Sequence, residues 1–147
     1  MKRHPGLQPL SREHHPALVQ AKRLRDFSGN SDQARELGET FLGFWDTEIA
    51  QHFRDEEELL LPLLARRSGD DSPEIMETLA QHVQLRRQVL ELRQRLEAGA
   101  ALDAPFLNGL GDGLKSHVRF EEDELFPSAE QALLEDDLKY IEAQLSA

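Results

Sequence analysis

The sequence predicts an all-α protein, an up-down-up-down four-helix bundle with a short fifth helix at its C-terminus. Three observations favour this class. Apolar residues recur at three- and four-residue spacings along most of the chain. Glycine, proline and cap residues divide the chain into segments of helical length, and no segment shows the sustained alternation of a strand. The 147 residues suit one domain, which we divide into an N-terminal arm (1–10), the bundle (11–127) and a C-terminal helix (128–147).

The first helix is expected at residues 11–27, because the arm before it contains two prolines and a glycine that disfavour a helix. Ser11 is a suitable N-cap. Pro16 removes a backbone donor early in this helix, so we expect either a late start or a distorted first turn. One face of the helix carries Leu10, His14, Ala17, Leu18, Ala21 and Leu24.

The second helix is expected at residues 32–67, after a short run of serine, glycine and asparagine that is typical of a loop and cap. Pro62 is expected to kink or loosen its last turns. The apolar stripe of this helix includes one histidine and one glutamate, so these two polar side chains are predicted to face inward. The stripe is Ala34, Leu37, Phe41, Trp45, Ile49, His52, Glu56, Leu59 and Leu63.

The third helix is expected at residues 73–98. Ser72 and Pro73 match the N-cap and first helical position that commonly begin a helix, and Gly99 is a suitable C-terminal stop. A single histidine again falls on the apolar side. The predicted buried residues are Ile75, Leu79, His82, Val89, Leu92 and Leu96.

The fourth helix is expected at residues 104–126, with Leu107, Leu110, Leu114, His117, Glu121 and Leu125 on its buried face. Pro127 and Ser128 are expected to break the chain. Ser128 and Gln131 resemble a capping box for a last helix at residues 129–145. That helix would pack through Leu134, Leu138, Ile141 and Leu145.

The charge balance limits the partners that we expect. Lysine and arginine number 17, aspartate and glutamate number 28, and the net charge is −11. Such an acidic chain is a poor partner for nucleic acid or for an anionic membrane surface. No apolar run has the length of a membrane span, and no signal peptide is visible, so we expect a cytoplasmic protein.

The chain contains no cysteine. Disulfides, thiolate metal ligands, iron–sulfur clusters and a cysteine nucleophile are therefore excluded. Any metal site must use histidine and carboxylate side chains, and the six histidines of the chain are the source of the imidazoles.

A motif with histidine and glutamate four residues apart occurs twice, as His52 with Glu56 and as His117 with Glu121. The copies share His, Arg, Glu, Glu, Leu and Pro at the same offsets. Residues four apart lie on one face of a helix. Both pairs continue an apolar stripe, so both are predicted to point into the core. A single such pair is usually solvated on a helix surface, but two inward copies favour a binding site.

Two further histidines, His14 and His82, also lie on inward faces. A bundle with two-fold pseudo-symmetry would bring these two and both motifs to one level of the core. Burying two carboxylates and four imidazoles without compensation is costly. A pair of metal ions removes that cost, because carboxylates can bridge the ions while imidazoles complete each site. The nitrogen-rich set suits Fe, Zn, Mn or Cu and disfavours Mg and Ca.

The combination of His14 after a glutamate, the two motifs, His82, and the Leu-Phe-Pro sequence at 125–127 resembles the hemerythrin-like (HHE cation-binding) family. The resemblance covers residues 10–145. It implies a four-helix bundle that holds a non-haem centre of two iron ions. By this resemblance, Glu56 and Glu121 bridge the irons, His14 and His52 bind one iron, and His82 and His117 bind the other.

The chain departs from the family pattern on the third helix. Oxygen-carrying hemerythrins have a His-x-x-x-His pair there, whereas Thr78 and Arg86 stand four residues on either side of His82. One iron is then under-ligated, completed by water, or completed by another carboxylate such as Glu48 or Glu124. An open coordination position is also where the chemistry of a small oxidant could occur.

Other polar residues near the motifs have simpler interpretations. His15 adjoins a predicted ligand but points away from the core, so it is a further ligand only if Pro16 distorts the helix. His4 is interpreted as a residue of the arm. Glu57 and Glu58 are interpreted as part of a solvated helix face.

The resemblance implies a protein that binds two iron ions, and the lack of a signal peptide leads us to expect it in the cytoplasm. The ligand set would also accept zinc or manganese as substitutes. The protein would bind or sense oxygen, nitric oxide or peroxide, or handle iron. An alternative is a redox enzyme that turns over peroxide or nitric oxide at an under-ligated di-iron centre. A third is a structural or regulatory bundle with zinc or an incidental metal, whose signalling role would need a separate protein partner. We expect a binding or sensing protein rather than a dedicated enzyme.

Overall fold

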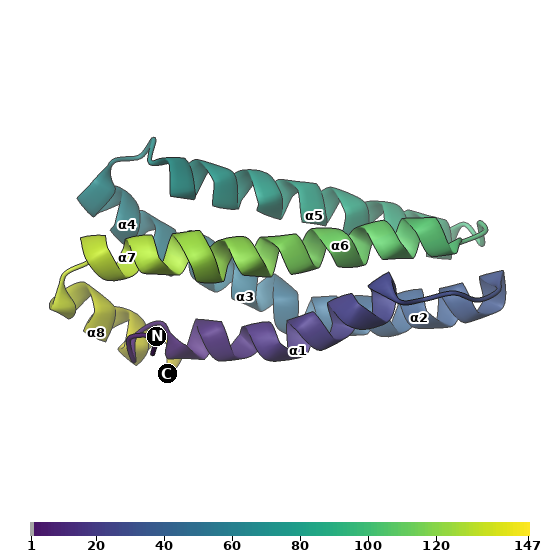
Figure 1. Cartoon of the computed structure of the whole chain (residues 1–147), viewed down its shortest axis with the longest axis horizontal. Helices are drawn as coiled ribbons and strands as arrows, with labels where there is room; N and C mark the ends of the chain where they lie inside the picture. Colours follow the sequence, from purple (N-terminus) through teal and green to yellow (C-terminus); the bar gives the residue numbers. More distant parts are fainter. Residues whose placement is uncertain (1) are drawn as a thin grey trace.

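A computed structural model describes residues 2–147, and within that range every regular element is helical. The all-α helical bundle expected from the sequence is confirmed (Figure 1). Two elements are single helices of the bundle, α1 (Gln8–Arg25) and α5 (Pro73–Glu97), and a shorter helix, α8 (Glu135–Leu145), ends the chain.

The other two rods of the bundle contain π-helical turns. One rod joins α2 (Ser31–Phe44), the π turn η1 (Trp45–Ile49), α3 (Ala50–Asp55), the π turn η2 (Glu56–Leu60) and α4 (Leu61–Ser68). The second rod joins α6 (Ala104–Phe120), the π turn η3 (Glu121–Leu125) and α7 (Phe126–Ala132).

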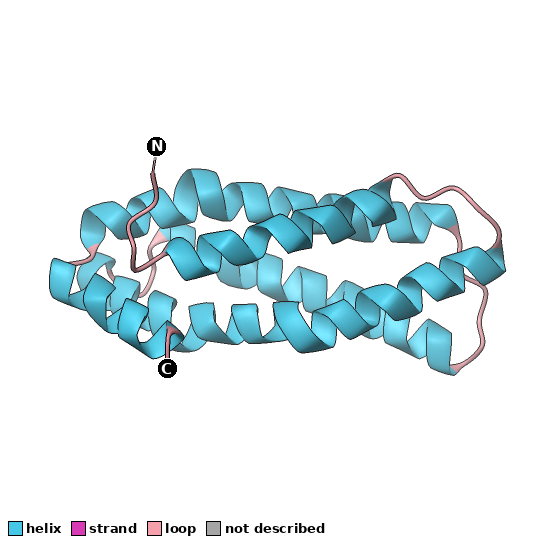
Figure 2. Ribbon diagram, turned by 90° about the horizontal axis from the view of Figure 1, so that it is seen from below, coloured by secondary structure: helices cyan, strands magenta, loops and turns pink. Residues whose placement is uncertain are grey.

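The course of the chain can be followed by colour in Figure 1. It passes from left to right along α1 and returns through α2, α3 and α4, then passes right again along α5 and returns through α6 and α7. Helix α8 folds back at the left end, and both termini lie toward that end in the two ribbon views (Figures 1 and 2). Within the described residues, no helix is both long and apolar enough to cross a membrane.

The fourth helix does not break at Pro127 as expected, but continues to Ala132. Proline lacks an N–H and its ring crowds the carbonyl four residues earlier. The π turn η3 ends two residues before Pro127, and η2 ends two residues before Pro62. The extra residue in each wide turn accommodates the proline, so the chain stays helical. The capping box expected at Ser128 is therefore wrong, because Ser128 lies inside α7.

The last helix begins at Glu135 rather than at residue 129. Its start is stabilised by Asp137, whose carboxylate accepts the N–H of Leu134 at 3.0 Å and ion-pairs with Arg67 at 2.8 Å. Asp137 is buried, and these contacts lower the pKa of its carboxyl group. Leu138 and Ile141 are buried as expected.

The N-terminal expectations also need correction. Helix α1 begins at Gln8, earlier than predicted, with a proline in its first turn. Ser11 is not an N-cap, because it lies inside α1 and its hydroxyl donates to Glu122 at 2.7 Å. Pro16 lies within a continuous helix, and Leu7 of the arm is fully buried. Three residues expected to be buried are instead exposed: Leu18, Leu79 and Leu134.

Two apolar clusters fill the bundle, one on each side of a polar layer. The larger cluster is built around residues such as Phe41, Phe53 and Leu110, and the second around residues such as Leu10 and Phe126. On α1, His14 lies between Leu10 of the second cluster and Ala17 of the first. The polar layer is therefore enclosed along the bundle axis by apolar packing.

Helices α1 and α6 approach closely at Gly111. A Cβ atom there would lie 2.6 Å from the carbonyl oxygen of Ala21 and 2.8 Å from the backbone nitrogen of Arg25. Only glycine permits this approach. The contact helps to hold α1, and with it His14, against the rod that carries His117 and Glu121.

Candidate metal centre

The structure brings the six predicted ligands together in one buried layer. They form two clusters, in each of which the potential ligand atoms lie within 4.8 Å of one another. Every one of the six side chains is buried. The first cluster is His14, His52, Glu56 and Glu121, and the second is Glu56, His82, His117 and Glu121. Both glutamates therefore belong to both clusters.

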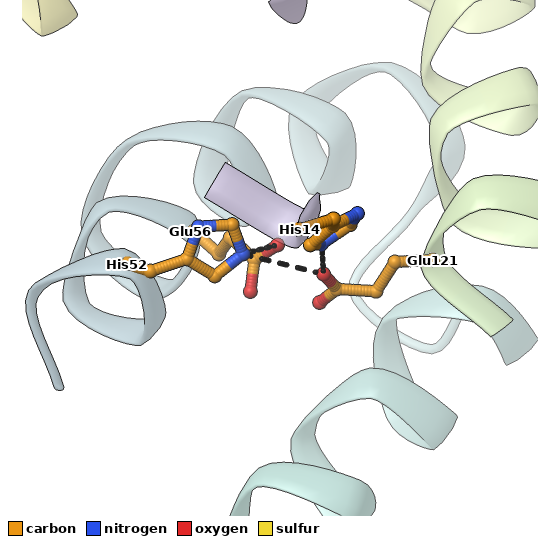
Figure 3. A group of neighbouring side chains, drawn as sticks. All are labelled: His14, His52, Glu56 and Glu121. Atoms are coloured by element: carbon orange, nitrogen blue, oxygen red, sulfur yellow. Dashed lines mark hydrogen bonds and ion pairs between the residues drawn. The ribbon is translucent and has the colours of Figure 1, made fainter. Parts of the chain in front are cut away.

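The first cluster joins α1, the rod of α2–α4, and η3 (Figure 3). Nε2 of His14 lies 2.8 Å from Oε1 of Glu121. Nε2 of His52 lies 3.1 Å from Oε2 of Glu56 and 3.5 Å from Oε1 of Glu121. Both imidazoles thus turn the same ring nitrogen toward the carboxylates.

The second cluster repeats this arrangement with the remaining oxygens. Nε2 of His82 lies 3.0 Å from Oε1 of Glu56 and 3.5 Å from Oε2 of Glu121. Nε2 of His117 lies 3.0 Å from Oε2 of Glu121. Each carboxylate therefore directs one oxygen to each cluster, as a carboxylate between two cations would do.

A second carboxylate in each motif orients the lone histidine of the other half. Nδ1 of His14 donates to Glu122 at 2.6 Å, and Nδ1 of His82 donates to Glu57 at 2.6 Å. A carboxylate has only acceptor atoms, so Nδ1 must carry the proton in each contact. The interpretation of Glu57 as a solvated residue is wrong. A signal was present in the sequence, since both motif copies have this second glutamate at the same offset.

The residue that precedes each lone histidine orients the histidine of a motif. Glu13, before His14, accepts the Nδ1 hydrogen bond of His52 at 2.8 Å. Gln81, before His82, lies 2.7 Å from Nδ1 of His117 through its Oε1 atom. These contacts hold the four imidazoles with Nε2 toward the centre, and such outer partners usually set the tautomer and direction of metal-binding histidines.

Two arginines contact the orienting carboxylates. Arg86 bonds to Glu57 at 2.7 Å, and Arg3 of the N-terminal arm bonds to Glu122 at 3.0 Å. Arg86 occupies the position four residues after His82, one of the two positions at which a second histidine could have completed a His-x-x-x-His pair. At the other, the buried hydroxyl of Thr78 donates to the carbonyl of Glu74 at 2.7 Å.

The further ligand candidates lie outside both clusters. His15, Glu48 and Glu124 have exposed side chains, and none belongs to either cluster among the described residues. His4 bonds to Glu135 at 3.1 Å, away from the centre. The structure therefore provides two imidazoles and two shared carboxylates to each cluster.

The electrostatics of the layer favour positive charge. Burial by itself would lower the pKa of His82, but the carboxylates of Glu121 and Glu56, which lie 3.5 and 3.0 Å from its Nε2, outweigh burial and raise the pKa to about 9. The carboxylates likewise raise the pKa of His52 well above its usual value, against the effect of burial. Burial opposes ionisation of Glu121, yet the surrounding imidazoles, with His117 foremost, hold its pKa well below the usual value. Protons and a metal cation would compete for the same Nε2 atoms.

The donor atoms of the layer are also better arranged to bind a metal ion than to hydrogen-bond to one another. Within the described residues, five of the central atoms are buried without a hydrogen-bond partner of acceptable geometry, although several lie near an oppositely charged group. They are Glu56 Oε1, Glu56 Oε2, His82 Nε2, His117 Nε2 and Glu121 Oε2. Unpartnered buried polar atoms are costly and rare. Nitrogen and oxygen donors that converge in this way suit a transition-metal cation.

A small cavity adjoins the layer between α1, the rod of α2–α4, and α6. It offers about 40 Å³ to the centres of water-sized molecules, which is enough for one or a few small molecules. His14, His52 and His117 line it together with apolar side chains that include Phe53 and Ile49. Three imidazoles of the layer therefore face a cavity that has room for small molecules.

Comparison with known proteins agrees with this arrangement. The family model described as the hemerythrin HHE cation binding domain matches residues 6–129. The chain belongs to this family. Searches of curated proteins and of solved structures found no match to the chain. The resemblance expected from the motifs is confirmed, and the family match together with the two His/Glu clusters indicates a metal-binding, hemerythrin-like protein.

Proposed function

We propose that this hemerythrin-like chain holds two iron ions and uses them to bind or sense a small ligand such as oxygen, nitric oxide or peroxide. In this proposal, Glu56 and Glu121 bridge the ions. One ion is bound by His14 and His52, and the other by the two remaining histidines of the layer. The observation that carries the proposal is the sharing of both carboxylates, with one oxygen of each directed to each cluster.

The number of donors supports a centre that reacts with small molecules. Two imidazoles and two carboxylate oxygens supply four donor atoms to each ion. Iron commonly accepts more ligands than this, so bound iron would supply open coordination positions to an incoming small ligand. The chain itself orients the imidazoles through Nδ1 and surrounds the layer with apolar packing that limits access of water.

The volume of the cavity supports the proposal of a small ligand. The cavity has room for a diatomic molecule or peroxide beside the imidazoles. Phe53 forms part of its wall and stacks on His82, with the ring centroids 3.7 Å apart. This aromatic wall would keep a bound oxidant in a dry environment.

The direct test is the metal content of protein loaded with Fe²⁺ under anaerobic conditions. The wild-type chain should bind two ions, and the double variant Glu56→Ala/Glu121→Ala should lose two-ion occupancy because both bridges are removed. Glu58→Ala/Glu124→Ala is a matched control, since both residues are exposed glutamates outside the clusters. Two irons retained by the Glu56→Ala/Glu121→Ala protein would refute the bridging assignment. If the protein instead purifies with stoichiometric zinc or manganese, the assignment of iron would be refuted.

The absence of a second histidine beside His82 favours one alternative function, the turnover of peroxide or nitric oxide at an open coordination position. Steady-state consumption of either compound by the iron-loaded protein would support an enzyme. Formation of a stoichiometric adduct without turnover would support binding or sensing. The two outcomes are distinguished by the number of ligand molecules consumed per protein chain.

A further inference from the structure

The two halves of the polar layer are alike in their inner residues but differ in one outer residue. Glu13 and Gln81 occupy equivalent places, each directly before a lone histidine, and each accepts an Nδ1 hydrogen bond from a motif histidine. The distances are also alike, 2.8 Å from Glu13 to His52 and 2.7 Å from Gln81 to His117. One acceptor is a carboxylate and the other is a neutral amide.

The remaining orienting carboxylates each lie beside an arginine. Around His14, the carboxylate of Glu122 is paired with Arg3, which also pairs with Glu130 at 2.8 Å. Around His82, the carboxylate of Glu57 is paired with Arg86. Each half thus has one orienting carboxylate beside one guanidinium, and Arg3 is shared with Glu130. Among the four groups that contact Nδ1 of an imidazole of the layer, Glu13 is the carboxylate whose counterpart in the other half, Gln81, is neutral.

The orientation of the Gln81 amide is determined by a further contact. Its Nε2 donates to Glu77 at 3.0 Å, which directs Oε1 toward His117. Gln81 is therefore a hydrogen-bond acceptor for His117, as Glu13 is for His52. The difference between the halves is one of charge and not of hydrogen-bond geometry.

A carboxylate behind an imidazole makes the ring a stronger donor to a metal and also attracts the cation directly. Changes of such outer partners typically alter metal affinity by about 10–100-fold. The side chain of Glu13 is 44% exposed, so water screens part of its charge. We therefore expect an effect of about tenfold, at the low end of this range.

We infer that Glu13 and Gln81 make the two metal positions unequal, so that the position held by His14 and His52 fills first and binds its ion more tightly. The position held by His82 and His117 fills second. This inference rests on the proposed two-ion function and adds an order of filling to it. Glu13 and Gln81 act as positioning residues, because each contacts a histidine and not the metal.

Two sets of substitutions test the inference. Glu13→Gln converts the carboxylate of the first half to an amide. For the second half, Gln81→Glu is combined with Glu77→Gln, because a carboxylate at position 81 would otherwise face Glu77 at close range. This pair moves one carboxylate by a helical turn and leaves the net charge of the chain unchanged. Glu77→Gln alone is the matched control.

The probe is Zn²⁺, which is diamagnetic and redox-inactive. Calorimetric titration gives the two affinities, and NMR of ¹⁵N-labelled histidine identifies which Nε2 atoms bind at each step. In the wild type, the first equivalent should shift the signals of His14 and His52, and the dissociation constants should differ by about tenfold. The Glu77→Gln/Gln81→Glu protein should bind both ions with nearly equal affinity, whereas the Glu77→Gln control should keep the wild-type order.

Adding Glu13→Gln to the Glu77→Gln/Gln81→Glu pair should reverse the order of filling. Equal affinities in the wild type would overturn the inference without any variant, so the test does not depend on variants that fold. An unchanged order in the triple variant would also overturn it, while leaving the two-ion function intact. Binding of fewer than two Zn²⁺ ions by the wild type would contradict the proposed function itself, and the inference with it.

Discussion

The two copies of the His-x-x-x-Glu motif resemble each other most closely where they face the core. In both, the histidine and glutamate enter one layer, the next glutamate orients a histidine of the other half, and a π turn precedes a proline. They differ in their solvent-facing surroundings. The cavity of about 40 Å³ is lined by histidines of both halves, but His117 of the second half also lines a polar groove with about 290 Å³ available to water. The common inner arrangement serves the proposed metal chemistry, and the outer differences can make its two positions unequal.

The largest effect is expected when the two central glutamates are compared. Glu121 lies within 3.5 Å of all four imidazoles, whereas Glu56 lies that close to two. Removing one partner of a buried charge pair typically costs about 3–5 kcal/mol. Glu121→Gln should therefore destabilise the metal-free protein by about this amount, and Glu56→Gln by less. Urea denaturation measures both, and equal losses would show that Glu121 is not the centre of the network.

The second effect is a pH dependence of the folding stability of the metal-free protein. The pKa of His82 is raised to about 9 by Glu121 and Glu56 against the effect of burial, and the same carboxylate contacts raise the pKa of His52. A histidine with a raised pKa in the folded state stabilises the fold fully below about pH 6.5. This contribution is lost as the pH rises through the folded-state pKa.

Stability of the metal-free protein should therefore decrease between about pH 6.5 and 9, by on the order of 3 kcal/mol from His82 alone. Chemical denaturation at several pH values checks this. In the His82→Asn variant, the free energy of unfolding should change less with pH than in the wild type. A stability that rises over this range in the metal-free wild type would contradict the charged imidazole network.

A smaller effect compares the orienting glutamates. Glu57→Gln and Glu122→Gln each replace the carboxylate behind a lone histidine while keeping an acceptor of the same shape. Each should weaken metal binding by about tenfold, and the two losses should be similar because the halves match at these positions. Competition with a chelator measures the affinities, and exposed Glu58→Gln is the control. Full affinity in both variants would mean that these carboxylates do not support the histidines.

The smallest effect concerns the two arginines. Arg3→Gln and Arg86→Gln remove partly exposed ion pairs, which usually contribute under about 1 kcal/mol. Metal affinity should change by no more than a few-fold in either variant. A much larger loss of metal affinity for Arg3→Gln than for Arg86→Gln would show that His14 requires the N-terminal arm for its orientation. The two arginines would then not have equivalent roles in the two halves.

The periodicity of the sequence was sufficient to predict the bundle and the inward direction of its polar residues. His52 and Glu56 continue an apolar stripe with helical spacing, so burial of the stripe carries them into the core. The same reasoning failed at Pro127, where a proline was interpreted as a break. The π turn that accommodates Pro127 depends on packing of the whole rod, and local residue preferences do not reveal it.

The sequence by itself determined the helical class, the six inward polar residues and the family pattern, because each depends on spacing along a single helix or on a motif. Only the tertiary structure decided how the imidazoles are oriented. Glu57 meets His82 across 25 positions of the chain, Glu13 meets His52 across 39, and Glu122 meets His14 across 108. Such partners are chosen by how the helices pack. The repeated second glutamate was visible in the sequence, but its role became evident only where the helices meet.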